Sequence, residues 1–434
     1  MNHQGCGHPS HINRRTLIKA AAGAAWLTPV AELLARDEEA KSPAKRKTPA
    51  KAVIMLWLQG GPSQLETFDP HSGTKIAGGT TSIETSAKGV QLAAGLEQLA
   101  DEMHDVALVR SVVSKEGDHE RATYNVKTGY RPVPALRHPA IGAAICNKID
   151  ETLEIPRHVS ILPGQWPARG GFLGDQYDAF KMGDPADPIP DVKSPVKSPR
   201  FKRRLGNLDV LEAEFARGRF ARLDLSKTLH RASIEAAEAM MSADQLTAFN
   251  VKEEPKSVLD AFGDSRFGRG CLAALRLIDV GVRCVEITLN GWDTHADNHA
   301  EQGERIKVLD PAMAALIREL RKREMLDSTI VVCCGEFGRT PTINPFDGRD
   351  HWPHGFSVAL FGGGIRGGAV VGATAPNPKL DKENPLRDVE NPRDVADIHA
   401  TILHQLGIDF EEELSSPIGR PMAISAGKII EEIV

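Results

Sequence analysis

The chain has 434 residues, of which 41% are hydrophobic and 26% charged, ordinary values for a globular protein. This length fits one large α/β domain or two smaller ones. A net charge of −5 argues against a nucleic-acid binder, and an aromatic content of 5% argues against a stacking platform for single strands.

The N-terminus has the pattern of a twin-arginine signal. Arg14-Arg15 is followed by Lys19 and by an apolar run from Ala20 to Leu34. The run contains Pro29 and is short for a membrane span, so we expect no stable membrane span after export. The signal implies the twin-arginine export machinery as a partner and a periplasmic or extracellular location. An ordinary amphipathic N-terminal helix is the alternative.

The expected domain boundaries follow from this signal. Residues 1–35 would be the signal peptide, 36–50 a charged linker, and 51–434 a single α/β domain. Within that domain, residues 163–200 are rich in Pro and Gly and predict a lid or a surface insertion.

Apolar runs and segments of helical spacing alternate along the rest of the chain. The predicted strands are 52–58, 106–109, 159–162, 283–289, 329–334 and 357–361. The predicted helices are 92–103, 120–127, 205–249, 267–279, 305–324 and 395–406. This alternation predicts an α/β fold with a doubly wound, mostly parallel sheet. The glycine-rich segment 362–368 lacks the Lys-Ser/Thr of a P-loop and predicts a turn between strands.

The six cysteines do not have the spacing of a zinc knuckle or of a disulfide framework. Two of them are adjacent, at Cys333-Cys334. We therefore expect the cysteines after the signal to pack in the core.

Potential metal ligands follow several of the predicted strands. Asp293 and His295 lie in a Trp-Asp-Thr-His segment after strand 283–289, and Glu336 follows strand 329–334. His351 lies in a loop before strand 357–361, where Asp350 could orient it. Ligands of open α/β proteins bind at the carboxyl ends of strands, so these side chains could meet. The alternatives are a polar loop in which Asp293 caps the next helix, and structural histidines.

Three further side chains, those of two arginines and one histidine, could bind or stabilise an anion near these potential metal ligands. Arg339 could either pair with Glu336 or bind a phosphate or sulfate oxygen pair, and Arg349 could help to stabilise transition-state charge. His119 precedes helix 120–127, whose N-terminus favours anions.

The segments GGPSQLETFDP (60–70), WDTH (292–295), GEFGRTP (335–341) and GRDHW (348–352) resemble the domain of unknown function 1501 family. This secreted, sulfatase-like family lies within the alkaline phosphatase and sulfatase superfamily. The resemblance covers about residues 50–410 and implies an alkaline phosphatase-like fold.

The same resemblance implies roles for individual residues. Asp293, His295 and His351 would complete one metal site, while Glu336 and Gln59 would remain from a second site. Gln59 stands where the superfamily has a metal-binding Asp. His119 occupies the nucleophile position, counted back from Thr128-Gly129. It could be a covalent nucleophile or a fourth metal ligand, with water activated by the metal as the nucleophile instead.

The resemblance favours an exported, metal-dependent hydrolase of phosphate or sulfate esters, acting on a small molecule or an anionic glycan. The expected cofactor is a divalent metal, zinc first, with calcium or another divalent ion as alternatives. A non-catalytic secreted binding protein on the same scaffold is the alternative function, and a partner of other exported proteins is a third.

Overall fold

The computed structural model describes residues 48–434 except 150–152, 190–191, 195, 218–228 and 382. The expected signal peptide and most of the charged linker lie outside the described residues. No helix among those described is long and apolar enough to cross a membrane.

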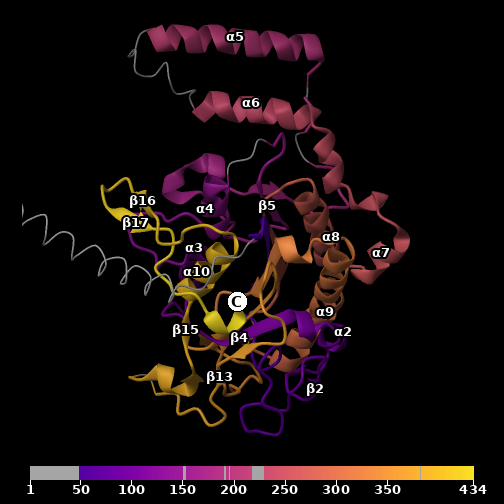
Figure 1. Cartoon of the computed structure of the whole chain (residues 1–434), viewed down its shortest axis with the longest axis vertical. Helices are drawn as coiled ribbons and strands as arrows, with labels where there is room; N and C mark the ends of the chain where they lie inside the picture. Colours follow the sequence, from indigo (N-terminus) through magenta and orange to yellow (C-terminus); the bar gives the residue numbers. More distant parts are fainter. Residues whose placement is uncertain (1–47, 150–152, 190–191, 195, 218–228, 382) are drawn as a thin grey trace, which may run out of the picture. The chain divides into compact units, whose positions relative to one another are not determined.

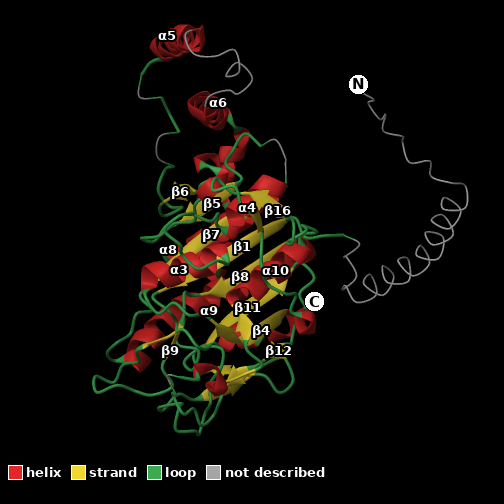
Figure 2. Ribbon diagram, turned by 90° about the vertical axis from the view of Figure 1, so that its left-hand side faces the viewer, coloured by secondary structure: helices red, strands yellow, loops and turns green. Residues whose placement is uncertain are grey.

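A nine-stranded sheet forms the centre, in the order β12-β4-β11-β8-β1-β7-β5-β6, with β15 paired to β4 (Figure 2). Its strands are β1 (Ala52–Gln59), β4 (Val106–Val113), β5 (His158–Ile161), β6 (Phe180–Met182), β7 (Cys284–Asn290), β8 (Thr329–Cys334), β11 (Phe356–Gly362), β12 (Val370–Val371) and β15 (Arg393–Asp394). All pairings are parallel except those of β11, which runs antiparallel to β4 and β8. The expected mostly parallel α/β sheet is confirmed, and it is mixed.

Four two-stranded sheets accompany the central sheet. They pair β2 (Ser82–Glu84) with β3 (Gln91–Ala93), β9 (Gly338–Arg339) with β10 (His351–Trp352), β13 (Ala373–Thr374) with β14 (Val389–Glu390), and β16 (Glu413–Ser415) with β17 (Pro421–Ala423).

Helices cover both faces of the central sheet (Figure 1). The described α-helices are α2 (Glu97–Ala100), α3 (His119–Thr128), α4 (Ile141–Lys148), α5 (Ser198–Arg217), α6 (Leu229–Ser242), α7 (Lys256–Ala261), α8 (Arg266–Asp279), α9 (Asn298–Lys322) and α10 (Val395–Gln405). Helices α2, α8 and α9 pack on one face, and α3, α4 and α10 on the other. The sheet is therefore doubly wound, as expected.

Strand β1 shows why a continuous apolar run forms a central strand. Ile54, Leu56 and Leu58 belong to the core under α8 and α9, while Val53 and Trp57 belong to the core under α4 and α10. Side chains of a strand alternate between its two faces, so a strand covered on both faces needs apolar residues at every position.

Three expectations for individual elements were wrong or incomplete. Segment 205–249 is not one α-helix, since α6 ends at Ser242 and a 3-10 helix follows over Asp244–Phe249. Segment 92–103 does not form one helix, because Gly95 adopts a φ of 103° between β3 and the short helix α2. The Pro/Gly-rich segment 163–200, expected as a lid or a surface insertion, is partly built into the central sheet, since it contributes the edge strand β6 and the start of α5. The five cysteines among the described residues are buried and free, which confirms their packing role.

The topology brings the sequence motifs to one edge of the sheet. Strands β1, β7 and β8 are parallel, and β4 runs in the same direction because both β4 and β8 are antiparallel to β11. The segments that follow these four strands therefore leave the sheet at the same edge, where β11 begins. This edge carries His119, Asp293, His295, Glu336 and His351.

Candidate metal centre

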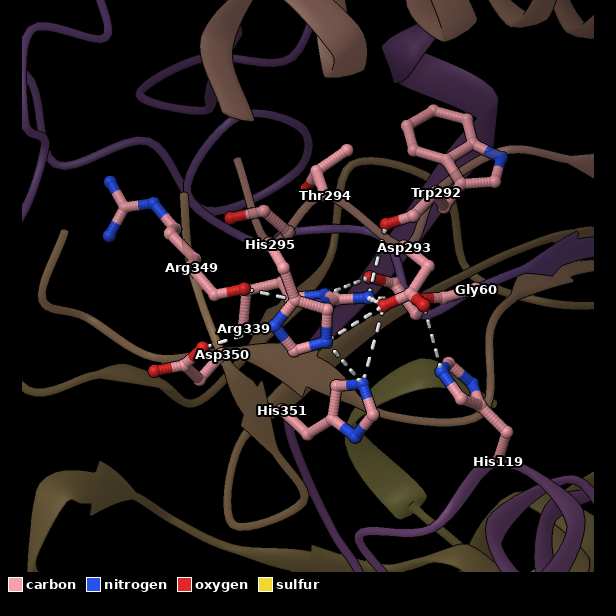
Figure 3. A network of polar contacts seen from close by, with 12 residues as sticks. Gly60, His119, Trp292, Asp293, Thr294, His295, Arg339, Arg349, Asp350 and His351 are labelled. Carbon is pink, nitrogen blue, oxygen red and sulfur yellow. Dashed lines mark hydrogen bonds and ion pairs between the residues drawn. The ribbon is translucent and has the colours of Figure 1, made fainter. Parts of the chain in front are cut away.

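Asp293, His295 and His351 converge at this edge (Figure 3). Nε2 of His295 lies 3.0 Å from Nε2 of His351 and 3.2 Å from Oδ1 of Asp293. Nε2 of His351 lies 3.3 Å from the same oxygen of Asp293. Three potential ligand atoms from two distant loops thus surround one point, as the sequence predicted.

The other ring nitrogen, Nδ1, of both His295 and His351 already has a hydrogen-bond partner. Nδ1 of His351 lies 2.8 Å from the carbonyl oxygen of Gly117, which can only accept, so this nitrogen carries the proton. Nδ1 of His295 lies 3.0 Å from a carboxylate oxygen of Asp350. Both Nε2 atoms therefore offer lone pairs toward each other, an arrangement that requires a proton or a cation between them.

His119 lies at the side of this trio, as the first residue of α3 after the N-cap Asp118. Its Nδ1 contacts Oε1 of Glu336 at 2.7 Å. Its Nε2 lies 3.3 Å from Oδ2 of Asp293 but has no hydrogen bond with suitable angles. Ligand atoms of His119, Asp293 and His351 lie within 4.8 Å of one another, so this His/Asp/His cluster could hold a metal ion.

The carboxylates around His119 determine its ionisation. Its close contact with Asp293, and then that with Glu336, raise the pKa of His119 to about 9. Partial burial opposes the charge of Asp293, but contacts with His119, His351 and Arg339 outweigh it and hold the pKa of Asp293 well below its ordinary value. The centre thus combines an ionised carboxylate with three imidazoles.

Arg339 contacts the centre from the protein interior and does not face solvent. Its guanidinium is fully buried, and Nη2 donates to Oδ1 of Asp293 at 2.6 Å. Nε and Nη1 donate to the carbonyl oxygens of Gly61 and Arg349. The expected contact with a substrate anion is therefore replaced by a contact with Asp293, and the alternative pairing with Glu336 is not formed.

Arg349 points away from the imidazoles (Figure 3). It is also fully buried and donates to Oε1 of Glu66 from Nε and Nη2, at 3.2 and 2.9 Å. Its remaining bonds go to the carbonyl oxygens of Thr340, Ile76 and Ala77. The sequence predicted that Arg349 helps to stabilise transition-state charge. Because its donors bond to buried acceptors, Arg349 is not available for that role at the cluster.

The resemblance assigned Glu336 and Gln59 to a second metal site; the structure places Glu336 against His119 and Gln59 against Gly164. Glu336 is fully buried behind His119, and its Oε1 also accepts from the backbone N–H of Gly60 at 2.9 Å. It therefore orients His119. The side-chain amide of Gln59 packs closely against Gly164, and among the described residues no hydrogen bond joins it to the cluster.

Two contacts that hold the loops were not expected. Asn344 donates from Nδ2 to the carbonyl oxygen of His295 at 3.0 Å and to Oδ1 of Asp350 at 3.2 Å. Asp350 thus orients His295, whereas the sequence suggested His351. The Asn-Pro pair at Asn344 is a turn signal that could have pointed to this loop.

Gly60 has a φ of 118°, and a Cβ there would lie 2.5 Å from the backbone nitrogen of Asp293.

Comparison with known families identifies the chain's relatives. A family described as "Protein of unknown function (DUF1501)" matches residues 50–434. The chain belongs to the DUF1501 family. The resemblance drawn from the four sequence segments is thereby confirmed. No curated protein matches the sequence of this DUF1501 member.

Several solved structures are similar to the DUF1501 chain at low sequence identity. The PsFucS1 sulfatase from Pseudoalteromonas sp. is 14% identical, with 86% of this chain and 70% of that chain covered and a TM-score of 0.38. The C-terminal periplasmic domain of EcEptC from Escherichia coli, in complex with Zn, is 8% identical, with 90% and 96% covered and a TM-score of 0.37. A Mg-bound mutant of TAB5 alkaline phosphatase is 12% identical, with 84% and 100% covered and a TM-score of 0.32.

Proposed function

We propose that this DUF1501 protein is an exported, metal-dependent hydrolase of phosphate or sulfate esters, acting on a small molecule or a glycan. The spacing of Asp293, His295 and His351 carries the proposal. Zinc binds its ligands at about 2.0–2.2 Å, so tetrahedral ligands lie roughly 3.3 Å apart. The three contacts of 3.0, 3.2 and 3.3 Å match that geometry.

The donor atoms favour zinc over calcium. Two imidazole nitrogens and one carboxylate oxygen suit zinc, whereas calcium takes six to eight oxygen ligands. Three protein ligands leave one tetrahedral position for water or substrate, as in catalytic zinc sites. When bound, the ion would polarise the ester and lower the pKa of water.

His119 is the residue that we assign to proton transfer. Glu336 fixes its Nδ1, and its Nε2 lies 3.3 Å from Oδ2 of Asp293. His295 and His351 contact the other oxygen, Oδ1, of the same carboxylate. An imidazole held in this way can exchange a proton with the leaving or attacking oxygen at Nε2. Arg339 meanwhile holds the carboxylate of Asp293 in place through its bond to Oδ1.

Metal analysis of protein exported in its folded form, followed by turnover assays, tests the proposal. We expect about one zinc per chain. Hydrolysis of 4-nitrophenyl phosphate or 4-nitrophenyl sulfate should disappear after chelation and return with zinc. Turnover that persists in metal-free protein would contradict a metal-dependent mechanism.

The role of His119 has its own test. His119→Ala should lower the rate at least ~100-fold with the fold intact, the usual scale for a positioned proton-transfer group. His104→Ala is the matched control, because His104 is exposed and bonds to Ser86 away from the centre. Equal rates for the two variants would remove His119 from the mechanism.

The binding-protein alternative predicts a different outcome. Gln59 stands where the superfamily has a metal-binding Asp, which is a loss expected if catalysis had been abandoned. An empty or calcium-filled centre, together with no turnover of either ester, would favour that alternative. Stoichiometric zinc with turnover would exclude it.

Export is proposed from the Arg14-Arg15 pattern, which lies outside the described residues. Replacing both arginines with Lys should block secretion, because the twin-arginine pathway reads the pair as an address. The fraction of protein outside the cytoplasm, measured for the wild type and the double variant, checks this. Unchanged secretion would show that the leader belongs to another pathway.

A further inference from the structure

A cavity of about 590 Å³ lies along α3, next to the candidate metal centre. We call it the α3 cavity. Its volume falls within the roughly 300–1,000 Å³ typical of small-molecule sites. Its lining includes Glu120, Thr123, Tyr124 and Lys127 from α3, the same helix that begins at His119.

Trp166 connects the cavity to the metal centre. Trp166 lines the cavity, and its ring is nearly parallel to that of His119, at 12° and with 6.5 Å between the ring centres. A group in the cavity would therefore lie one aromatic ring away from the imidazole that we assign to proton transfer.

The cavity contains buried polar groups. Lys127 is 5% exposed, and its Nζ donates to the carbonyl oxygen of Trp166 and to Glu286, both at 2.8 Å. Thr123 is 1% exposed, and its hydroxyl has no hydrogen-bond partner. Neighbouring atoms cover both groups, so a ligand would meet the exposed polar side chains of the lining, those of Glu120, Arg137, Arg169 and Asp175.

The charges of the lining cancel. The lining includes three basic residues, Lys127, Arg137 and Arg169, and three acidic residues, Glu120, Asp175 and Asp178. Such a lining does not select an anion, and this many charged groups disfavours a purely apolar ligand. Together with the Trp166 ring and several prolines, it suits a neutral ring that carries many hydroxyl groups.

We infer that the α3 cavity binds a neutral sugar, which would be the alcohol half of the ester substrate. The second part of this inference rests on the proposed hydrolase function. The sugar ring would pack on Trp166, and its hydroxyls would bond to the charged side chains of the lining. The ester group would extend from the sugar past the edge of Trp166 toward His119.

Binding of neutral oligosaccharides tests the inference without requiring turnover. The full chain, treated with a chelator, is applied to an array of neutral, sulfated and phosphorylated oligosaccharides, and the best neutral ligand is titrated by calorimetry. We expect Trp166→Ala to weaken binding at least about tenfold, as for a buried aromatic contact.

Control variants separate recognition from folding. Trp166→Phe keeps an aromatic ring and should retain most of the affinity. Leu386→Ala changes a partly exposed apolar side chain that does not line the cavity, and should leave affinity unchanged. Binding only to anionic oligosaccharides, binding to none, or equal affinity in Trp166→Ala would overturn the inference.

The result also separates this inference from the proposed function. If neutral sugars bind with the expected variant pattern but no ester is hydrolysed, the cavity assignment stands and the hydrolase proposal fails. If 4-nitrophenyl esters are hydrolysed but no neutral sugar binds, the hydrolase proposal stands and the cavity assignment fails.

Discussion

Two polar clusters lie near the same edge of the sheet and differ in how their polar atoms are used. In the buried arginine cluster, Arg339 and Arg349 are fully buried and donate to carbonyl oxygens and carboxylates on all sides. In the open imidazole cluster, His119, His295 and His351 are partly exposed, and their Nε2 atoms face one another or Asp293. Sequence motifs of similar composition thus produce two different environments.

The difference separates residues that stabilise the fold from residues available for chemistry. A buried charge is tolerated when its hydrogen bonds are complete, and such a group has no donor left for a ligand. The imidazoles have fixed Nδ1 atoms and uncommitted Nε2 atoms, which is how proteins prepare histidines to bind metal.

The largest effect is expected from breaking the buried arginine cluster. Arg349→Ala would leave several carbonyl oxygens buried without their donor, and the buried carboxylate of Glu66 with only Thr80 and His299 beside it. Removing one partner of a buried ion pair costs about 3–5 kcal/mol, and we expect a loss of that size in the free energy of unfolding. Urea denaturation of both proteins measures it.

A second variant tests the cause of that loss. Adding Glu66→Gln to Arg349→Ala should recover part of the stability, because the unpaired buried charge is removed. Zinc content per folded chain should stay unchanged in both variants. A decrease of less than about 1 kcal/mol in the free energy of unfolding would contradict a structural role for Arg349. A loss of zinc without a loss of stability would instead indicate that Arg349 acts at the metal centre.

His399 provides a buried histidine to compare with the open ones. It lies on α10 and its Nε2 donates to the carbonyl oxygen of Val126 at 2.7 Å. Burial lowers the pKa of His399 to about 4, against 6.5 for the free side chain. The imidazole is therefore neutral in the folded protein, while the unfolded chain takes up a proton below pH 6.5.

This difference predicts how stability depends on pH. The contribution of His399 is complete above pH 6.5 and is lost progressively as pH falls to about 4, by about 3 kcal/mol at most. His399→Gln keeps a donor for Val126 but cannot ionise. The difference in unfolding free energy between wild type and variant should shift by this amount between pH 7.5 and 4.5, and a constant difference would show that His399 does not control it.

Much of this edge of the sheet was predictable from sequence, since it depends on local pattern. Apolar runs marked β1, β7 and β8, and polar residues followed each of them, so Asp293 was expected near His351. The convergence then follows from parallel strands, because their carboxyl ends share an edge.

Side-chain direction was not predictable, because it depends on partners far away in sequence. Arg349 bonds to Glu66, 283 residues earlier, and no local pattern indicates that pairing. The resemblance did place Glu336 near His119, 217 residues away, but as a metal ligand and not as the hydrogen-bond partner of Nδ1. The antiparallel direction of β11 also had no local signal, since its apolar run would read the same in either direction.

The smallest expected effect concerns Asp350, which joins the open imidazole cluster to its supporting loop. Its Oδ1 accepts from Nδ1 of His295 at 3.0 Å and from Asn344 at 3.2 Å. Asp350→Asn removes the charge that orients and polarises His295 while keeping the shape of the side chain. Changes to such supporting residues typically cost 10- to 100-fold in metal affinity, and we expect a loss of zinc affinity in that range.

Asp347→Asn is the matched control for that loss. Asp347 lies in the same loop, is exposed, and has a φ of 55°, a conformation that Asn adopts readily. Zinc affinities of both metal-free variants, measured by competition with a chromophoric chelator, should differ by at least about tenfold. The two variants carry the same change in net charge, so equal affinities would mean that Asp350 does not act through His295. In that case the hydrogen bond from Asn344 to the backbone of His295, rather than the pair of Asp350 and His295, would position the open imidazole cluster.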